Sequence, residues 1–201
     1  VAVPFIEKGA PIVIAMPSAV YGHQDKSLVG LLMRLFYQGA LPVLPGANLM
    51  LSYVYVEDVA EGIIQAADRG KIGEAYLLTG PSLTLKEATI LWADILDRRP
   101  PVGIPGEVFQ PLAPILGALN RAVKLPSVLT DETIRLLKAT YIARSDKARE
   151  QLGWRPRPLR EGLRETFDWI ASTTPPPQPR KRKAAGLALA TALFILLIWL
   201  L

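Results

Sequence analysis

The sequence predicts an α/β fold built around a parallel sheet. Three short apolar runs alternate with segments of helical periodicity, and this order is typical of strand–helix–strand units. The runs are apolar throughout rather than alternating with polar residues, as expected of strands that helices cover on both faces. With 201 residues, 50% of them apolar, the chain is long enough to bury one core of ordinary size.

The first strand is expected at residues 11–16, an apolar run that ends at Pro17. After a turn region, Ser27 has the side chain of a helix N-cap, and Gly39 suits the left-handed position that closes a helix. Between them, apolar residues recur with the spacing of one helical face: Leu28, Leu31, Leu32, Leu35 and Phe36. This helix should pack on the sheet.

The second strand is expected at residues 51–56, followed by another helix. Asp58 and Glu61 have the spacing of a capping box, in which the first residue caps the helix and the second bonds back to it. We therefore interpret Asp58 as an N-cap worth about 1 kcal/mol rather than as a catalytic carboxylate.

The third strand is expected at residues 75–78, and Thr84 with Glu87 repeats the capping pattern before the next helix. Trp92 falls on the apolar face of that helix and should be a core residue. Beyond Arg99, five prolines interrupt the pattern, and we expect this region to form the substrate side, with a helix at 115–123.

Two further helices are expected to close the globular part. Ser145 should cap a short helix that ends at Gly153, and an amphipathic helix should end near Ile170. Trp154 and Trp169 are expected to be packing residues.

The C-terminal region has the composition of a linker and a membrane span. Residues 173–183 are rich in proline and then basic, so they should form a stiff linker after a globular part at 1–172. Residues 184–201 carry no charge, and a helix of this length reaches about 27 Å, close to the thickness of a hydrocarbon core. We expect a transmembrane helix there, with the lipid bilayer as a partner and the globular part in the cytoplasm, because the basic residues precede the span.

Charge and composition exclude several classes of function. The formal net charge is +5, but four of the 23 basic residues lie at 180–183, and the other 19 nearly balance 18 acidic residues. This distribution argues against nucleic-acid binding. The chain has no cysteine and one histidine, His23, so neither a cysteine-based zinc site nor a histidine-rich metal site is expected.

Four segments carry a resemblance to a known family. Residues 12–22 resemble the strand and turn that meet the nicotinamide end of the cofactor in extended short-chain dehydrogenases/reductases, the NAD-dependent epimerase/dehydratase family. Residues 53–62, 73–76 and 145–156 resemble later segments of that family, in its order. The sequence of residues 17–22 is similar to the matching segment of dihydroflavonol reductases and β-hydroxysteroid dehydrogenases. Sugar-nucleotide epimerases and dehydratases are the next most similar subfamilies.

The resemblance implies a fold and a cofactor. Residues 1–172 would be the C-terminal part of a Rossmann-like doubly wound sheet with a small substrate-binding lobe, and the full-length parent would bind NAD or NADP. The cofactor-binding residues would be Pro17, Ser18, Ala19 and Val20, through backbone groups that meet the nicotinamide. Tyr21 and His23 would line the substrate pocket. The alternatives are an ordinary strand-ending turn and a solvated loop histidine.

The departures from the family concern catalysis. The sequence has no glycine-rich phosphate turn and no Tyr-x-x-x-Lys pair, so no catalytic residue is assigned to this chain. By the resemblance, residues 1–9 are the end of the helix that carries that pair. The first residue is Val1 rather than Met, and we expect a fragment. Met16 stands where the family often has arginine before the proline.

Three functions remain open. The first is part of a membrane-anchored NAD(P)-dependent oxidoreductase that acts on a small, apolar alcohol or ketone. The second is a sugar-nucleotide epimerase or dehydratase of the same family. The third is a non-catalytic, membrane-tethered domain that binds a ligand or partner.

Overall fold

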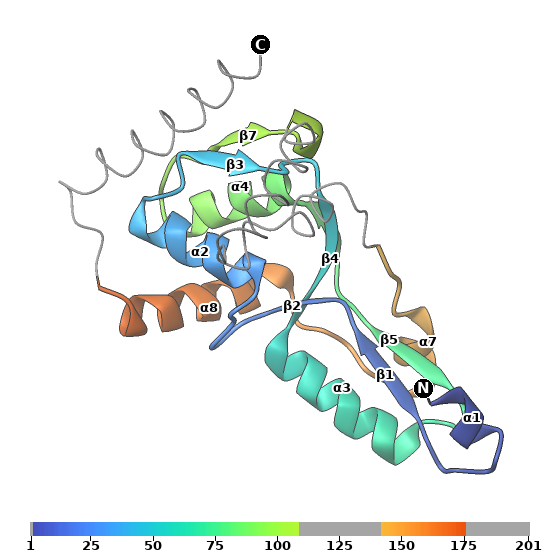
Figure 1. Cartoon of the computed structure of the whole chain (residues 1–201). Helices are drawn as coiled ribbons and strands as arrows, with labels where there is room; N and C mark the ends of the chain where they lie inside the picture. The colour runs from blue at the N-terminus through green and yellow to red at the C-terminus, as the bar shows by residue number, and fades with distance from the viewer. Residues whose placement is uncertain (1, 109–141, 176–201) are drawn as a thin grey trace, which may run out of the picture. The chain divides into compact units, whose positions relative to one another are not determined.

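The computed structural model describes residues 2–108 and 142–175 (Figure 1). The chain divides into two compact units. Unit 1 consists of Val1–Asp25, Met50–Leu83 and Tyr141–Thr166, and unit 2 consists of Lys26–Leu49, Thr84–Thr140 and Phe167–Leu201. The helix predicted at 115–123 and the apolar tail at 184–201 lie outside the described residues.

The predicted fold class and location included a C-terminal transmembrane helix, and this part is corrected. No helix within residues 2–108 and 142–175 is long and apolar enough to cross a membrane. The longest helix of this part has 15 residues, and a crossing needs about 20 predominantly apolar ones. The fold of the described residues is α/β, and nothing in them supports the predicted membrane location or lipid partner.

Unit 1 contains two small parallel pairings. Strand β1 (Ile14–Pro17) pairs in parallel with β5 (Ala75–Leu78). Strand β2 (Ala19–Tyr21) pairs in parallel with β4 (Met50–Tyr55), and β6 (Ser82–Thr84) lies on the other edge of β4. The expected strands at 11–16, 51–56 and 75–78 are thus present, although the first is shorter than predicted.

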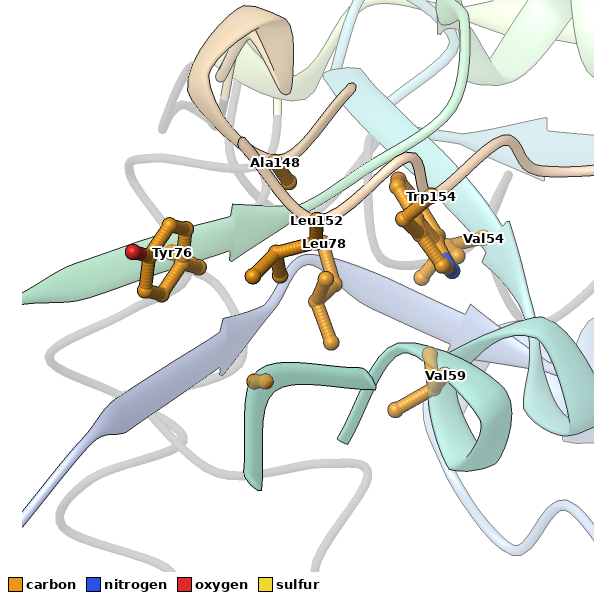
Figure 2. Packing of buried hydrophobic residues seen from close by; sticks show 8 residues of the cluster. Val54, Val59, Tyr76, Leu78, Ala148, Leu152 and Trp154 are labelled. Atoms are coloured by element: carbon orange, nitrogen blue, oxygen red, sulfur yellow. The ribbon is translucent and has the colours of Figure 1, made fainter. Parts of the chain in front are cut away.

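Helices α3 (Val56–Arg69) and α7 (Asp146–Gln151) cover one face of these strands, and α1 (Val3–Ile6) precedes β1. Apolar side chains from both helices and from β4 and β5 form the core of the unit (Figure 2). Tyr76 and Leu78 are fully buried there, and Trp154 closes the core with 1% of its surface exposed. The prediction that Trp154 is a packing residue is confirmed.

Unit 2 contains helices α2 (Leu28–Gln38) and α4 (Leu85–Ile95) and the parallel strands β3 (Val43–Pro45) and β7 (Val102–Ile104). Helix α8 (Leu159–Thr173) begins in unit 1 and ends in unit 2. Trp92 is buried between the rings of Phe36 and Phe167, at centroid distances of 6.1 and 6.2 Å, as predicted for a core residue.

The local helix signals have mixed outcomes. Ser27 Oγ accepts a hydrogen bond from the backbone of Gly30, and Gly39 ends α2 in the left-handed conformation, as predicted. The capping box of Thr84 and Glu87 is also confirmed. Ser145 precedes α7 but makes no capping bond, and its hydroxyl instead accepts a bond from Arg149 Nε.

The capping role assigned to Asp58 is wrong. Helix α3 begins at Val56, two residues before Asp58, and its N-cap residue Tyr55 makes no side-chain capping bond. Asp58 therefore lies within the first turn of the helix, and its carboxylate binds elsewhere.

Candidate functional site

The turn at residues 17–20 lies at the carboxyl ends of two parallel strands in unit 1. Strand β1 ends at Pro17 and β2 begins at Ala19, so Ser18 alone joins them. The backbone N–H of Ser18 donates to the carbonyl of Leu78, the last residue of β5, at 3.3 Å. Ligands of open α/β sheets bind beyond the carboxyl ends of strands, so this turn is in the expected position for a ligand site.

The side chain of Ser18 gives the turn unused hydrogen-bonding capacity. Its Oγ is buried and has no hydrogen-bond partner among the described residues. A buried hydroxyl without a partner costs about 1–3 kcal/mol, and natural proteins rarely leave one in that state without a reason. A ligand that offers an amide or carbonyl group at this turn would satisfy it.

Tyr21 is a buried residue at the end of β2. Only 2% of its surface is exposed, and its hydroxyl donates to the carbonyl of Leu159 at 3.3 Å. Its ring lies 6.5 Å from that of Tyr53 and 5.6 Å from that of Tyr55. Burial, with a smaller effect of the Asp58 charge, raises the pKa of the Tyr21 phenol well above its usual value. The phenol therefore stays protonated and is a poor general base.

His23 follows the same turn and meets Tyr55 rather than Tyr21. Its Nε2 lies 3.2 Å from the Tyr55 hydroxyl, and the two rings meet edge to face at 6.0 Å. Burial, and then a hydrogen bond with Glu165, raises the pKa of the Tyr55 phenol. Tyr21 and His23, both predicted for the substrate pocket, are thus linked through Tyr55, which the sequence did not single out.

Gly22, between Tyr21 and His23, allows the backbone of this turn to lie close to Val56 at the start of α3. Its φ is +142°, and a Cβ at this position would lie 2.5 Å from Cγ1 of Val56. Any larger residue would push the turn away from the start of α3. The Tyr21-Gly22-His23 sequence therefore needs glycine at its centre for a steric reason.

Arg157 contacts the Tyr55 ring and binds three neighbouring carboxylates. Its guanidinium lies 4.2 Å from the centroid of the Tyr55 ring, and its Nε donates to Asp58 Oδ1 at 2.8 Å. Its other nitrogens bind Glu165 at 2.8 Å and Glu57 at 3.1 Å. One arginine thus binds three carboxylates and contacts the ring that meets His23.

Asp58 forms hydrogen bonds both with Arg157 and with the core residue Trp154. Its Oδ2 accepts a bond from the backbone N–H of Arg157 at 3.0 Å, and its carbonyl accepts one from Trp154 Nε1 at 2.8 Å. With its charge paired and 5% of its surface exposed, Asp58 is a structural residue. A sequence pattern could not reveal this role, because Arg157 is 99 positions away.

Unit 2 has a separate cavity of about 630 Å³ near the end of α2. Its lining residues are Phe36, Gly39, Leu41, Pro42, Asp97, Arg98, Arg99, Pro100 and Pro101. Arg98 donates to the backbone carbonyls of Phe36 and Tyr37 there and so closes the helix end. The cavity contains none of the residues predicted for the site.

The geometry in unit 1 suits binding and positioning rather than acid–base chemistry. The two phenols of Tyr21 and Tyr55 are held protonated, and no group of three or more potential metal ligands exists in residues 2–108 and 142–175. The turn offers a ligand its backbone groups and the unpartnered hydroxyl of Ser18.

Comparisons with known proteins agree on one family. The chain is 30% identical over 183 residues to 3β-hydroxysteroid-dehydrogenase/decarboxylase isoform 2 of Arabidopsis thaliana, covering 79% of this chain and 31% of that protein. It is 29% identical over 170 residues to sterol demethylase protein B of Methylococcus capsulatus, covering 81% and 51%. The chain thus spans about half the length, or less, of these curated relatives.

Solved structures share the fold. A nucleoside-diphosphate-sugar epimerase from Pseudomonas aeruginosa superposes with a TM-score of 0.64 at 25% identity, over 86% of this chain and 52% of that one. More distant neighbours with the same fold were solved with NAD or NADPH bound.

No family model matches the sequence. The sequence relatives and the solved structures nevertheless point to one family, and the parallel pairing of β1 with β5 fits its α/β fold. The chain belongs to the NAD-dependent epimerase/dehydratase family, the extended short-chain dehydrogenases/reductases.

Proposed function

We propose that the chain is the C-terminal part of an NAD(P)-dependent oxidoreductase that acts on a small, apolar alcohol or ketone. The observation that carries the proposal is the turn at Ser18, where a buried, unpartnered hydroxyl lies at the carboxyl ends of β1 and β5. This is where a doubly wound fold places the end of a dinucleotide.

The turn fits the nicotinamide end of the cofactor. Backbone groups of Pro17 to Val20 and the Ser18 hydroxyl would hold its carboxamide, an amide that both donates and accepts hydrogen bonds. The cofactor, when bound, supplies the hydride acceptor or donor. The residues of this chain would orient it and exclude water, and the acid–base pair would come from another part of the protein.

One observation favours an apolar substrate. The relatives at 29–30% identity are a 3β-hydroxysteroid dehydrogenase/decarboxylase and a sterol demethylase protein, and both names refer to steroids or sterols.

A sugar-nucleotide epimerase or dehydratase is the second candidate, and it is supported by the epimerase of the same fold at 25% identity. A domain that binds a ligand without catalysis is the third. The three differ in what binds at the turn and in whether hydride moves.

The decisive experiment uses the protein expressed from its complete reading frame. Calorimetric titration should show saturable binding either of NAD+ and NADH or of NADP+ and NADPH. Nicotinamide absorbance should then change with a 3β-hydroxysteroid and not with a nucleoside-diphosphate sugar. The opposite substrate preference would favour the second candidate. Binding of neither cofactor pair would end the oxidoreductase proposal.

A further inference from the structure

Unit 2 has a cavity that the proposed function does not use. Its volume of about 630 Å³ lies within the range of about 300–1,000 Å³ that is usual for small-molecule sites. The lining comes from the end of α2, the turn before β3 and the turn between α4 and β7. All of these segments belong to unit 2, whereas the Ser18 turn belongs to unit 1.

The cavity lies at the amino ends of two paired strands. Pro42 directly precedes β3 and Pro101 directly precedes β7, and the backbone N–H of Val102 donates to the carbonyl of Pro42 at 3.0 Å. Because proline fixes φ, this part of the lining is rigid. The ligand position expected for α/β folds is at the carboxyl ends of strands, so this cavity is a different kind of site.

Part of the lining is apolar and well packed. Phe36 and Leu41 are buried, with 4% and 7% of their surfaces exposed. The ring of Trp92 packs against that of Phe36, and its buried Nε1 has no hydrogen-bond partner among the described residues. Natural proteins rarely leave a buried donor in this state. The cavity thus has an apolar surface, and an unused donor adjoins one of its lining residues.

Asp97, at the end of α4, has a strained backbone. Its φ is +48°, in the left-handed region that favours glycine. The backbone N–H of the next residue, Arg98, donates to the carbonyl of Ala93 at 2.8 Å and so ends the helix. Strained residues cluster at ligand sites, where the position of the side chain matters more than the cost of the strain.

Two side chains of opposite charge are available in the same lining. Asp97 and Arg99 are both exposed, and neither side chain forms a hydrogen bond or an ion pair within residues 2–108 and 142–175. Arg98, between them, is held elsewhere, because it donates to the carbonyls of Phe36 and Tyr37. One carboxylate and one guanidinium therefore border the apolar surface.

We propose that this cavity binds a small zwitterion with an apolar body, of the class of free α-amino acids with an apolar side chain. Arg99 binds the α-carboxylate and Asp97 binds the α-ammonium, both through charge-assisted hydrogen bonds. The side chain of the ligand lies on Phe36 and Leu41. A neutral apolar molecule or a simple anion would leave at least one of the two charged side chains unused.

Calorimetric titration of the protein from the complete reading frame with L-phenylalanine tests the proposal. Two analogues with the same ring are the ligand controls: phenylpropionate lacks the ammonium group, and phenethylamine lacks the carboxylate. L-phenylalanine should bind saturably. Each analogue should bind about tenfold more weakly, or weaker still, because it loses one charge-assisted hydrogen bond.

Conservative variants locate the binding. Arg99→Gln should weaken the binding of L-phenylalanine about tenfold and leave that of phenethylamine unchanged. Asp97→Asn should weaken L-phenylalanine to a similar degree and leave phenylpropionate unchanged, and asparagine tolerates the left-handed backbone as aspartate does. Arg155→Gln is the matched control, because Arg155 is also an exposed arginine but belongs to unit 1, and it should leave all three affinities unchanged.

Three results would overturn the proposal. The first is the absence of saturable binding of L-phenylalanine. The second is an affinity that the variants of Asp97 and Arg99 reduce no more than Arg155→Gln does. The third is a loss in only one of the first two variants, which would replace the zwitterion by a simple ion. Cofactor binding has no part in the readout, so this site and the proposed function can fail separately.

Discussion

The carboxylate of Asp58 holds Arg157 by two hydrogen bonds, one to its backbone N–H at 3.0 Å and one to its Nε at 2.8 Å. The side chain of Asp58 is 7% exposed and that of Arg157 is 21% exposed. This pair joins the first turn of α3 to the segment between α7 and α8. It also fixes the guanidinium over the Tyr55 ring, and so links the stability of unit 1 to the geometry of the candidate site.

Replacing Asp58 should destabilise the protein strongly. Asp58→Ala removes the buried acceptor of two hydrogen bonds from Arg157, at its backbone N–H and its Nε, and we expect a loss of about 2–3 kcal/mol although Glu57 and Glu165 still bind the guanidinium. The free energy of unfolding in urea measures the loss. Asp68→Ala on the same helix is the control, because the Asp68–Arg69 pair is exposed and contributes about 0–1 kcal/mol. Similar losses for both variants would show that the anchor has no special role.

Gly22 should tolerate no side chain. Gly22→Ala combines a positive φ with a contact of 2.5 Å to Val56, and we expect a loss of about 2 kcal/mol or more. Gly9→Ala is the matched control, since Gly9 also has a positive φ, +86°, but an added Cβ would meet nothing within 4 Å. It should cost about 1 kcal/mol, from backbone strain alone. Equal thermal midpoints for the two variants would contradict the close approach.

The buried tyrosines should make the protein sensitive to alkali. Burial raises the pKa of Tyr21 and of Tyr55 in the folded state, so above the ordinary value of about 10 the unfolded chain loses protons that the folded chain keeps. Their stabilising effect is complete below pH 10 and is lost as the pH rises further, by up to about 1.4 kcal/mol per pH unit for each group. Urea midpoints measured across this range should fall, and Tyr21→Phe should make the decline shallower. An unchanged slope in that variant would rule out Tyr21 as a source.

Ser18→Ala should separate stability from ligand binding. Removing a buried hydroxyl without a partner should leave the free energy of unfolding unchanged or slightly higher. In the protein from the complete reading frame, the same change should weaken cofactor binding by about fivefold to tenfold, the effect of one hydrogen bond of about 1 kcal/mol. Ser172→Ala near the end of α8, where the hydroxyl bonds to Trp169, is the control and should leave cofactor affinity unchanged. Unaltered calorimetric affinity in Ser18→Ala would remove this hydroxyl from the site.

Sequence reasoning succeeded where the signal is local. Ser27, Gly39 and the box of Thr84 and Glu87 act within a few residues, and the structure confirms all of them. Asp58 and Glu61 have the same spacing as Thr84 and Glu87, yet Asp58 binds a partner 99 positions downstream. A local pattern carries no information about such a partner.

In the candidate site, too, the local features could be predicted and the long-range contacts could not. The apolar run and the Pro17 boundary located the turn, but the role of Tyr55 depends on the parallel register that places it opposite Tyr21. The three-residue strands β2, β3, β6 and β7 were also missed, since segments this short have too few residues to show a periodicity. The roles of residues 17–20 in cofactor binding stay a prediction.

Unit 1 is assembled from three separated stretches of chain, and this affects how the protein is made. Its sheet strands leave the ribosome by Leu83, but Ala148, Trp154 and Arg157, which cover and lock the core, are synthesised much later. During that interval, Tyr76 and Leu78 lack the packing of Ala148 and Trp154 and are more exposed to solvent and chaperones. Chaperone binding to ribosome-bound chains should therefore persist until Arg157 has emerged, and should then fall.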